Sequence, residues 1–281
     1  MLKHSLLLAF AVALPGLASA ASPERIVSLG GDITETIYAL DAQSSLVGVD
    51  STSEWPAAAR ALPDVGYVRQ LAAEGVLSLR PELIIATHDA GPPPVLAQLR
   101  SAGIRIETLP VTYTPDEVVA KVRSIGHLLG KDSAANQLAD KIQTQYGELA
   151  KAVTGMPKHP RAIFMMSAGG GSPLLAGNDT AATHAIALAG GLNAVDGYTG
   201  YKPVSAEAMA ALAPDVIVLM RERADVLGGV EGVLKLPGVA LTPAGKARRV
   251  ILVDGQALLG FGPRNAEQEL VLQRELAALG R

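Results

Sequence analysis

The chain has 281 residues, of which 49% are hydrophobic and 18% charged, so it is long enough for two lobes that each bury a core. Its formal net charge of −3 gives no basis for a nucleic-acid partner or an anionic membrane surface. The sequence contains no cysteine, which excludes disulfides and thiolate metal sites.

Residues 1–20 have the pattern of a secretory signal peptide. Lys3 supplies a positive charge, an apolar run from Leu6 to Leu14 follows, and Ala18-Ser19-Ala20 has the small residues of a cleavage site. The apolar run is too short to cross a bilayer. We therefore expect the mature chain to be exported and soluble.

Short apolar strands alternate with helices in the first half of the mature chain. Strands are predicted at residues 25–29, 46–49, 83–86 and 105–109, and helices at 34–40, from Glu74, at 95–102 and at 115–129. Such alternation is typical of a parallel sheet that helices cover on both faces.

A longer helix is predicted from about Ala134 to Val153. Its apolar side chains recur at helical spacing, and its interior contains no proline. The apolar positions are Leu138, Ile142, Tyr146, Leu149 and Val153. We interpret residues 131–156 as a stiff connector between an N-terminal lobe, 22–130, and a C-terminal lobe, 157–281.

The second lobe opens with a strand at 161–166 and a glycine-rich turn at 167–173. A helix at 181–189, strands at 216–219 and 249–253, and an amphipathic helix at 265–279 follow. This order again predicts a small sheet flanked by helices.

One stretch of the first lobe returns in the second. The segment 66–88 reads as a loop, a short helix and a buried strand, and the segment 200–221 has the same order. Glu74 matches Glu207 and Pro81 matches Pro214 at one common separation, which is too long for a solenoid repeat. The expected fold is α/β, with two similar lobes, each a small parallel sheet flanked by helices, and a site between them.

Tyr67 lies in the loop that opens the first copy of this segment. A tyrosine binds ferric iron as its phenolate, and a nearby cation favours the ionised form. Arg69, two residues further on, is placed to supply that charge and a hydrogen bond. The alternative is a half-buried tyrosine whose ring packs and whose hydroxyl is solvated.

Arg221 and Arg223 follow the strand 216–219. Ligands of parallel sheets gather beyond the carboxyl ends of the strands, where an arginine can bind a carboxylate through two hydrogen bonds. The alternative is a pair of solvated charges with Glu222 and Asp225 as local partners.

Glu74 and Glu207 each fall in the first turn of a predicted helix. A carboxylate there offsets the helix dipole, which is sufficient reason for either residue alone. Their pairing across the repeat suggests a second reading, two matched acidic knobs that dock on arginines of a membrane partner.

Catalytic and metal-binding patterns are absent from the rest of the sequence. The turn around Gly170-Gly171-Ser172 fits neither a phosphate-binding loop nor a nucleophile elbow. No pair of histidines has metal-ligand spacing, and only His88, at a strand end, is expected near the cleft. An exported hydrolase therefore remains the weaker alternative, and we expect no enzymatic activity.

Residues 25–35, the paired segments and the connector helix together resemble periplasmic substrate-binding proteins of the helical-hinge class. These serve ABC importers for haem, ferric siderophores and vitamin B12, and the resemblance covers residues 22–281. Within the class, residues 66–79 are similar to the haem-binding branch of Gram-negative bacteria.

The resemblance implies a role for each candidate residue. Tyr67 would be the axial ligand of ferric haem b, and Arg69 would steady its phenolate. Arg221 or Arg223 would line the haem pocket, and strand-end placement favours Arg221. Glu74 and Glu207 would dock on the permease.

The resemblance also implies a periplasmic monomer that hands haem to an inner-membrane ABC permease. The turn after residue 166 has no histidine, so we expect five-coordinate iron or water as the sixth ligand. A ferric siderophore or corrinoid is the alternative cargo. The 4% aromatic content speaks against a siderophore.

Overall fold

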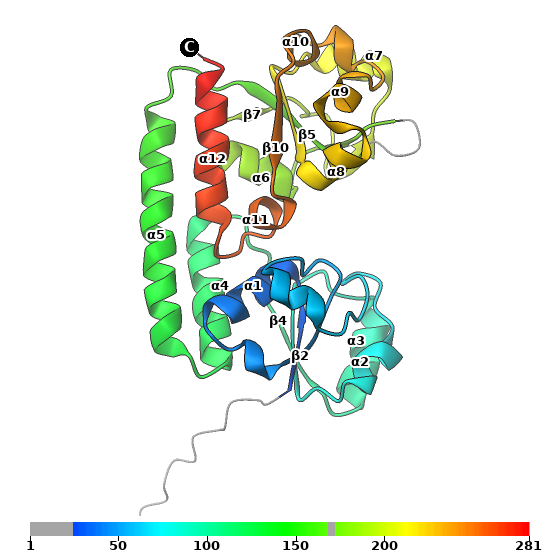
Figure 1. Cartoon of the computed structure of the whole chain (residues 1–281), viewed down its shortest axis with the longest axis vertical. Coiled ribbons are helices and arrows are strands. Elements are labelled where there is room, and N and C mark those ends of the chain that lie inside the picture. Colours follow the sequence, from blue (N-terminus) through cyan, green and yellow to red (C-terminus); the bar gives the residue numbers. More distant parts are fainter. Residues whose placement is uncertain (1–24, 168–171, 281) are drawn as a thin grey trace, which may run out of the picture.

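The computed structural model describes residues 25–167 and 172–280, and these form two α/β lobes stacked along one long helix, α5 (Figure 1). The predicted signal peptide and most of the glycine-rich turn, residues 168–171, lie outside the described residues. Within the described residues, no helix combines the length and the apolar character needed to cross a membrane.

The elements of the first lobe and of the long helix are β1 (Ile26–Leu29), α1 (Gly31–Ala39), β2 (Leu46–Val49), α2 (Ala73–Ser78), β3 (Leu83–Ala86), α3 (Pro93–Ser101), β4 (Arg105–Thr108), α4 (Pro115–Leu128) and α5 (Asp132–Thr154). Those of the second lobe are β5 (Arg161–Ser167), β6 (Leu174–Ala176), α6 (Ala181–Leu188), β7 (Leu192–Asn193), β8 (Tyr201–Pro203), α7 (Ala206–Leu212), β9 (Val216–Met220), α8 (Arg221–Val226), α9 (Gly229–Leu234), α10 (Pro243–Lys246), β10 (Val250–Val253), α11 (Gly255–Leu259) and α12 (Asn265–Ala278). Short 3-10 helices lie at Gln43–Ser45, Ala57–Ala61 and Val239–Leu241.

The two sheets repeat one topology. The first has the order β2-β1-β3-β4, and all its pairings are parallel. In the second, β7, β5, β9 and β10 are paired in parallel in the same succession. This confirms the two similar α/β lobes predicted from the sequence.

The second sheet departs from the prediction in being mixed. Strands β6 and β8 extend it, and both β5 with β6 and β6 with β8 are antiparallel. Sequence periodicity missed both because each is only three residues long.

The internal repeat extends to backbone conformation. Arg80 and Ala213 directly precede the matched prolines, and both adopt a left-handed conformation, with φ of 47° and 44°. Gly66 and Gly200, which open the two segments, also have positive φ. In both lobes the chain therefore leaves the short helix and enters the buried strand through the same sharp turn.

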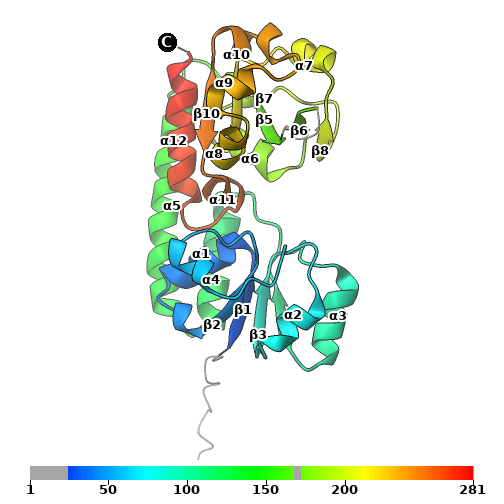
Figure 2. The same ribbon diagram turned by 45° about the vertical axis from the view of Figure 1, so that its right-hand side comes forward.

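Helix α5 joins the lobes and packs on both. Its buried side chains are Ala135, Ala139, Ile142, Tyr146 and Leu149, which form one stripe along the helix. They belong to a continuous apolar core that includes β1 of the first lobe and α12 of the second. Helix α5 lies beside α4 and α12 in every view (Figures 1 and 2).

Candidate functional site

A cavity of about 710 Å³ lies between the lobes. Its wall includes residues that follow β1, β3, β9 and β10, because the carboxyl ends of these strands face the same gap. Tyr67, Arg69 and Tyr113 line it from the first lobe, and Tyr201, Met220 and Arg223 from the second. Its size is in the range of small-molecule and cofactor sites, roughly 300–1,000 Å³.

Tyr67 and Arg69 form a hydrogen-bonded pair on this wall. The Nη1 group of Arg69 donates to the Tyr67 hydroxyl, and its guanidinium carbon lies 5.6 Å from the centre of the tyrosine ring. Tyr67 remains 37% exposed and lines the cavity. The structure thus brings together two of the residues singled out in the sequence.

The loop that carries this pair is held by backbone hydrogen bonds. Leu71 donates to the carbonyl of Gly91 at 2.9 Å, and Gly91 donates to that of Val68 at 2.9 Å. Gly66, with φ of 93°, turns the chain into the loop, a conformation that residues with a side chain rarely adopt. The loop is therefore fixed against the segment that follows β3.

Sequence reasoning missed Asp89, which lies beyond Arg69. The Nε of Arg69 donates to Asp89 Oδ2 at 2.6 Å, and the Thr87 hydroxyl donates to Asp89 Oδ1 at 2.8 Å. Burial lowers the pKa of Arg69, but the charge of Asp89 and the hydrogen bonds to Tyr67 and Asp89 together outweigh burial, so the net shift is upward. Burial also raises the pKa of Asp89, but Thr87 and Arg69 bring it below its usual range.

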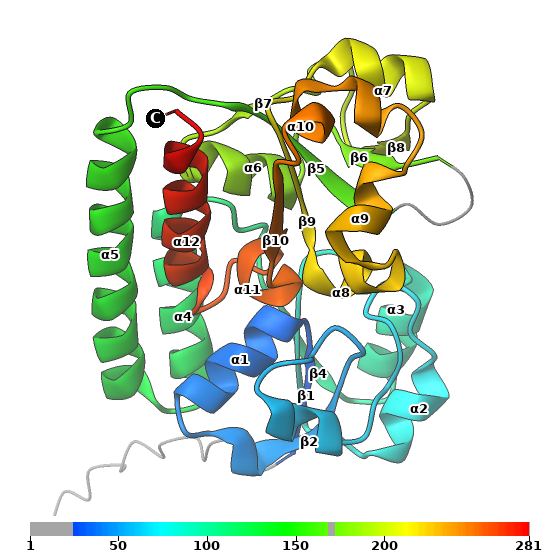
Figure 3. The same ribbon diagram turned by 45° about the horizontal axis from the view of Figure 1, so that its top comes forward.

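Arg221 and Arg223 have different surroundings. Both belong to α8, a short helix that the sequence analysis did not predict, which begins directly after β9 (Figure 3). Arg223 lines the cavity, whereas Arg221 does not and donates to the carbonyl of Leu252 at 3.4 Å. The cavity wall therefore favours Arg223 over Arg221 as the arginine of the pocket, and this choice stays a prediction.

Tyr201 is the counterpart of Tyr67 in the repeat, since each directly follows a glycine of positive φ. It lines the cavity from the second lobe, and burial raises its pKa. Residue 203, in the position corresponding to Arg69, is a proline. Only the first-lobe copy therefore has an arginine two residues after its tyrosine, and Lys202, which follows Tyr201, lies 5.1 Å from the centre of the Tyr198 ring.

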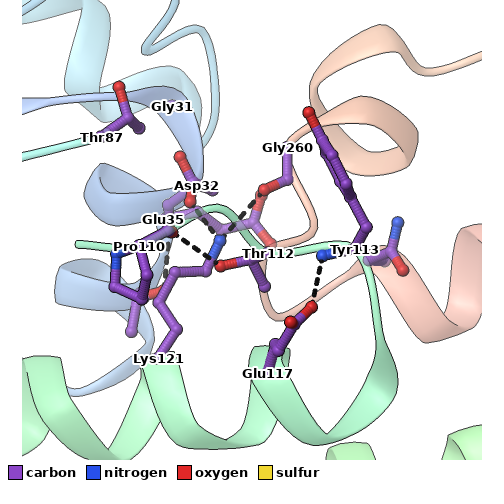
Figure 4. A network of polar contacts seen from close by, with 12 residues as sticks. Gly31, Asp32, Glu35, Thr87, Pro110, Thr112, Tyr113, Glu117, Lys121 and Gly260 are labelled. Carbon is purple, nitrogen blue, oxygen red and sulfur yellow. Dashed lines mark hydrogen bonds and ion pairs between the residues drawn. The ribbon is translucent and has the colours of Figure 1, made fainter. Parts of the chain in front are cut away.

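Two polar clusters, one around Lys121 and one around Arg264, join the lobes beside the cavity. The amino group of Lys121 lies 2.5 Å from Asp32 Oδ2 and donates to the carbonyl of Gly260 at 3.2 Å (Figure 4). Arg264 lies 2.9 Å from Glu35 Oε2 and also pairs with Asp254 at 2.7 Å. Burial raises the pKa of Glu35, and Arg264 opposes that shift.

Glu74 and Glu207 lie in the first turns of α2 and α7 and are exposed. Both helices are on the side of the molecule away from α5 (Figures 1 and 2). Hydrogen bonds from its own backbone and from the Ser205 side chain hold the pKa of Glu207 below its usual range. Both glutamates are thus exposed at the starts of their helices.

The remaining candidates are readily placed. His88 is exposed and lines the cavity, as expected for a residue after β3. His184 stacks on Tyr113 with ring centres 4.6 Å apart. Across residues 25–167 and 172–280, His, Asp and Glu side chains form no cluster that could hold a metal ion.

Two α/β lobes with a cavity at their facing strand ends define a ligand-binding protein of the two-lobed type. The family model described as periplasmic binding protein matches residues 26–257. The chain belongs to the periplasmic binding protein family.

Solved structures of similar proteins cover nearly the whole chain. The periplasmic heme-binding protein BhuT, in complex with two hemes, is 38% identical with a TM-score of 0.86, over 92% of this chain and 99% of that one. RhuT from Roseiflexus sp. RS-1, in apo form, is 38% identical with a TM-score of 0.87 over the same shares. A periplasmic heme-binding protein from Pseudomonas aeruginosa is 35% identical with a TM-score of 0.83, over 92% and 94%.

Curated relatives are more distant in sequence, and one of them is named for a different ligand. The uncharacterized ABC transporter substrate-binding lipoprotein YvrC of Bacillus subtilis is 28% identical over 87% of this chain and 77% of its own length. A cobalamin-binding protein of Halobacterium salinarum is 29% identical over 87% of this chain and 67% of its length. Both relatives are named as binding proteins.

Proposed function

We propose that this chain binds ferric haem b in the inter-lobe cavity, through Tyr67 as axial ligand. It acts in the periplasm as a monomer and delivers haem to an inner-membrane ABC permease, without catalysing a reaction. The hydrogen bond from Arg69 to the Tyr67 hydroxyl on the cavity wall carries this proposal. The similarity to periplasmic heme-binding proteins, at 35–38% identity, supports it.

The pair has the chemistry that ferric haem requires. Tyrosine is an established axial ligand of haem, and it binds as the phenolate. An arginine side chain stays charged at any ordinary pH, so Arg69 offsets the negative oxygen, and it donates a hydrogen bond to it. Tyr201 has a proline at residue 203 where the first lobe has Arg69, and its neighbour Lys202 lies over the ring of Tyr198 instead, which favours Tyr67 as the ligand.

The other walls supply contacts for the rest of the ligand. Met166, Met220 and Leu259 line the cavity from the second lobe and offer an apolar surface to a porphyrin face. Arg223 lines the same cavity and fits a propionate, since a guanidinium binds carboxylates through two parallel hydrogen bonds. We assign no haem contact to Arg221.

The visible spectrum tests the ligand. Purified chain titrated with ferric haem is expected to show a high-spin tyrosinate spectrum, which Tyr67→Phe abolishes. Tyr201→Phe is the matched control, because it removes a second phenol from the same cavity and should keep the spectrum. Unchanged binding and spectrum in Tyr67→Phe would reject Tyr67 as ligand.

A corrinoid is the second candidate, because a curated relative is named as a cobalamin-binding protein. A corrinoid brings its own axial groups, so its binding would not depend on the Tyr67 hydroxyl. Titration with cobalamin followed by calorimetry separates the two. Tight cobalamin binding that Tyr67→Phe leaves intact, with no haem binding, would favour the corrinoid.

We also propose that Glu74 and Glu207 dock the loaded protein on the permease. They occupy equivalent positions in the two lobes and are exposed on the side away from α5. Glu74→Ala with Glu207→Ala is expected to abolish uptake and leave haem affinity intact. Glu148→Ala, at an exposed position on α5, is the control. Loss of haem affinity in the double variant would refute docking as their role.

A further inference from the structure

We propose that Asp89 is a positioning residue for the iron ligand Tyr67 and acts on it through Arg69. The inference rests on the proposed function and assigns a role to a residue outside the Tyr67 and Arg69 pair. All three side chains line the cavity.

The guanidinium of Arg69 donates hydrogen bonds to two partners, Asp89 and Tyr67. Its Nε donates to Asp89 Oδ2 at 2.6 Å, and its Nη2 forms an ion pair with the same oxygen. Its Nη1 donates to the Tyr67 hydroxyl. Because the guanidinium is planar, holding one edge on Asp89 also sets the direction of the remaining nitrogen.

Asp89 is itself held by the end of the sheet. The Thr87 hydroxyl donates to its other oxygen, Oδ1, at 2.8 Å, and the Thr87 backbone donates to the carbonyl of Leu29 at 2.9 Å. A continuous chain of contacts therefore runs from the end of β1 through Thr87, Asp89 and Arg69 to Tyr67.

Arg69 needs such support because its side chain is 56% exposed. Ordering a free arginine side chain costs rotamer entropy, and water competes for its donors. Asp89 holds the guanidinium in place before the ligand arrives. Without it, Arg69 is free to turn into solvent, and the phenolate loses its donor.

Asp89 also brings a negative charge to the site, and this acts in the opposite direction on the phenolate. Positioning predicts that loss of Asp89 makes the tyrosinate easier to protonate. Removal of a negative charge alone predicts that it becomes harder to protonate. The direction of the change therefore identifies which effect dominates.

The test is a pH titration of the ferric haem complex, followed by the tyrosinate band. In Asp89→Ala and in the near-isosteric Asp89→Asn we expect the acid midpoint to move to higher pH by about one unit, a tenfold easier protonation. Thr87→Val should move it in the same direction by less. Asp116→Ala removes the same charge from an exposed position outside the cavity and should leave the midpoint unchanged.

Thermal unfolding of each variant verifies that it is folded. If Asp89→Ala does not fold, the test uses Asp89→Asn alone. A wild-type tyrosinate spectrum with an unchanged or lowered midpoint in Asp89→Asn would overturn this inference and leave the proposed function standing. A wild-type chain that binds haem without a tyrosinate spectrum would overturn both.

Discussion

Gln256 of α11 forms hydrogen bonds with both backbone groups of Trp55 across the gap between the lobes. Its Oε1 accepts from the Trp55 N–H at 2.8 Å, and its Nε2 donates to the Trp55 carbonyl at 3.3 Å. The same amide accepts from the Glu54 N–H at 2.9 Å and donates to the Gly31 carbonyl at 2.8 Å. One side chain of the second lobe thus satisfies four backbone groups of the first, beside the cavity. Its helix, α11, lies close to α1 (Figure 3).

We predict that Gln256→Ala loosens the contact between the lobes. The free energy of unfolding should fall by about 1–3 kcal/mol, because the variant leaves backbone groups without partners. Urea unfolding measures this loss, and solution scattering should show a larger radius of gyration. Gln256→Glu keeps the acceptor and loses the donor, so its free energy of unfolding should lie between those of wild type and Gln256→Ala. Identical unfolding of Gln256→Ala and wild type would contradict a role in holding the lobes.

The second prediction concerns the ion pair of Arg264 and Glu35. The Glu35 side chain is 5% exposed, so Arg264→Ala leaves a buried carboxylate without its cation and should cost about 3 kcal/mol. The double variant Glu35→Gln with Arg264→Met removes both charges and should cost less than the single change. Chemical denaturation of the set tests this, and a double variant less stable than Arg264→Ala would refute it.

The third prediction is a pH dependence that originates in α12. Glu269 is fully buried, and burial raises its pKa well above the usual value of 4.5. The folded chain therefore holds this proton more tightly than the unfolded chain. Its contribution to stability is complete below pH 4.5 and is lost as the pH rises toward the folded-state pKa.

Replacing Glu269 by glutamine removes the loss of stability that Glu269 causes as the pH rises. Relative to wild type, Glu269→Gln should gain a few degrees in Tm between pH 5 and pH 8, at roughly 2–4 °C per kcal/mol for a chain of this size. Glu275→Gln, exposed on the same helix, is the control and should run parallel to wild type. If the Tm of wild type and of Glu269→Gln changed with pH in parallel, Glu269 would not be the source of the pH dependence.

The fourth prediction tests the long helix. Gly147 is exposed on α5, and an added Cβ would meet no atom within 4 Å. Gly147→Ala should therefore stabilise the chain by about 0.5–1 kcal/mol. At Gly126 of α4 an added Cβ would collide with the Cβ of Ala135 on α5, so Gly126→Ala should destabilise it. Thermal unfolding of both variants measures the contrast, and equal effects would contradict it.

The sequence predicted those parts of the fold that depend on near neighbours in the chain. The buried strand Leu83–Ala86 lies at the predicted residues, and α5 extends the predicted helix only slightly at each end. Tyr67 and Arg69 could be paired in advance because they share one short loop. Local propensity and apolar spacing carry this information.

Contacts between distant segments were beyond that reasoning. Asp89 meets Arg69 from a different loop, and nothing near either residue marks the other as its partner. The choice between Arg221 and Arg223 depended on a helical turn that is too short to leave a periodic signal.

The sequence by itself determined two α/β lobes, a stiff helix between them and a tyrosine with an arginine beside it, since each follows from residues within one segment. Only the tertiary structure decided which side chains share the cavity and how Gln256 and Arg264 hold the lobes together. The physical reason is that these contacts join residues far apart in the chain, and packing of the two sheets and α5 sets their distances.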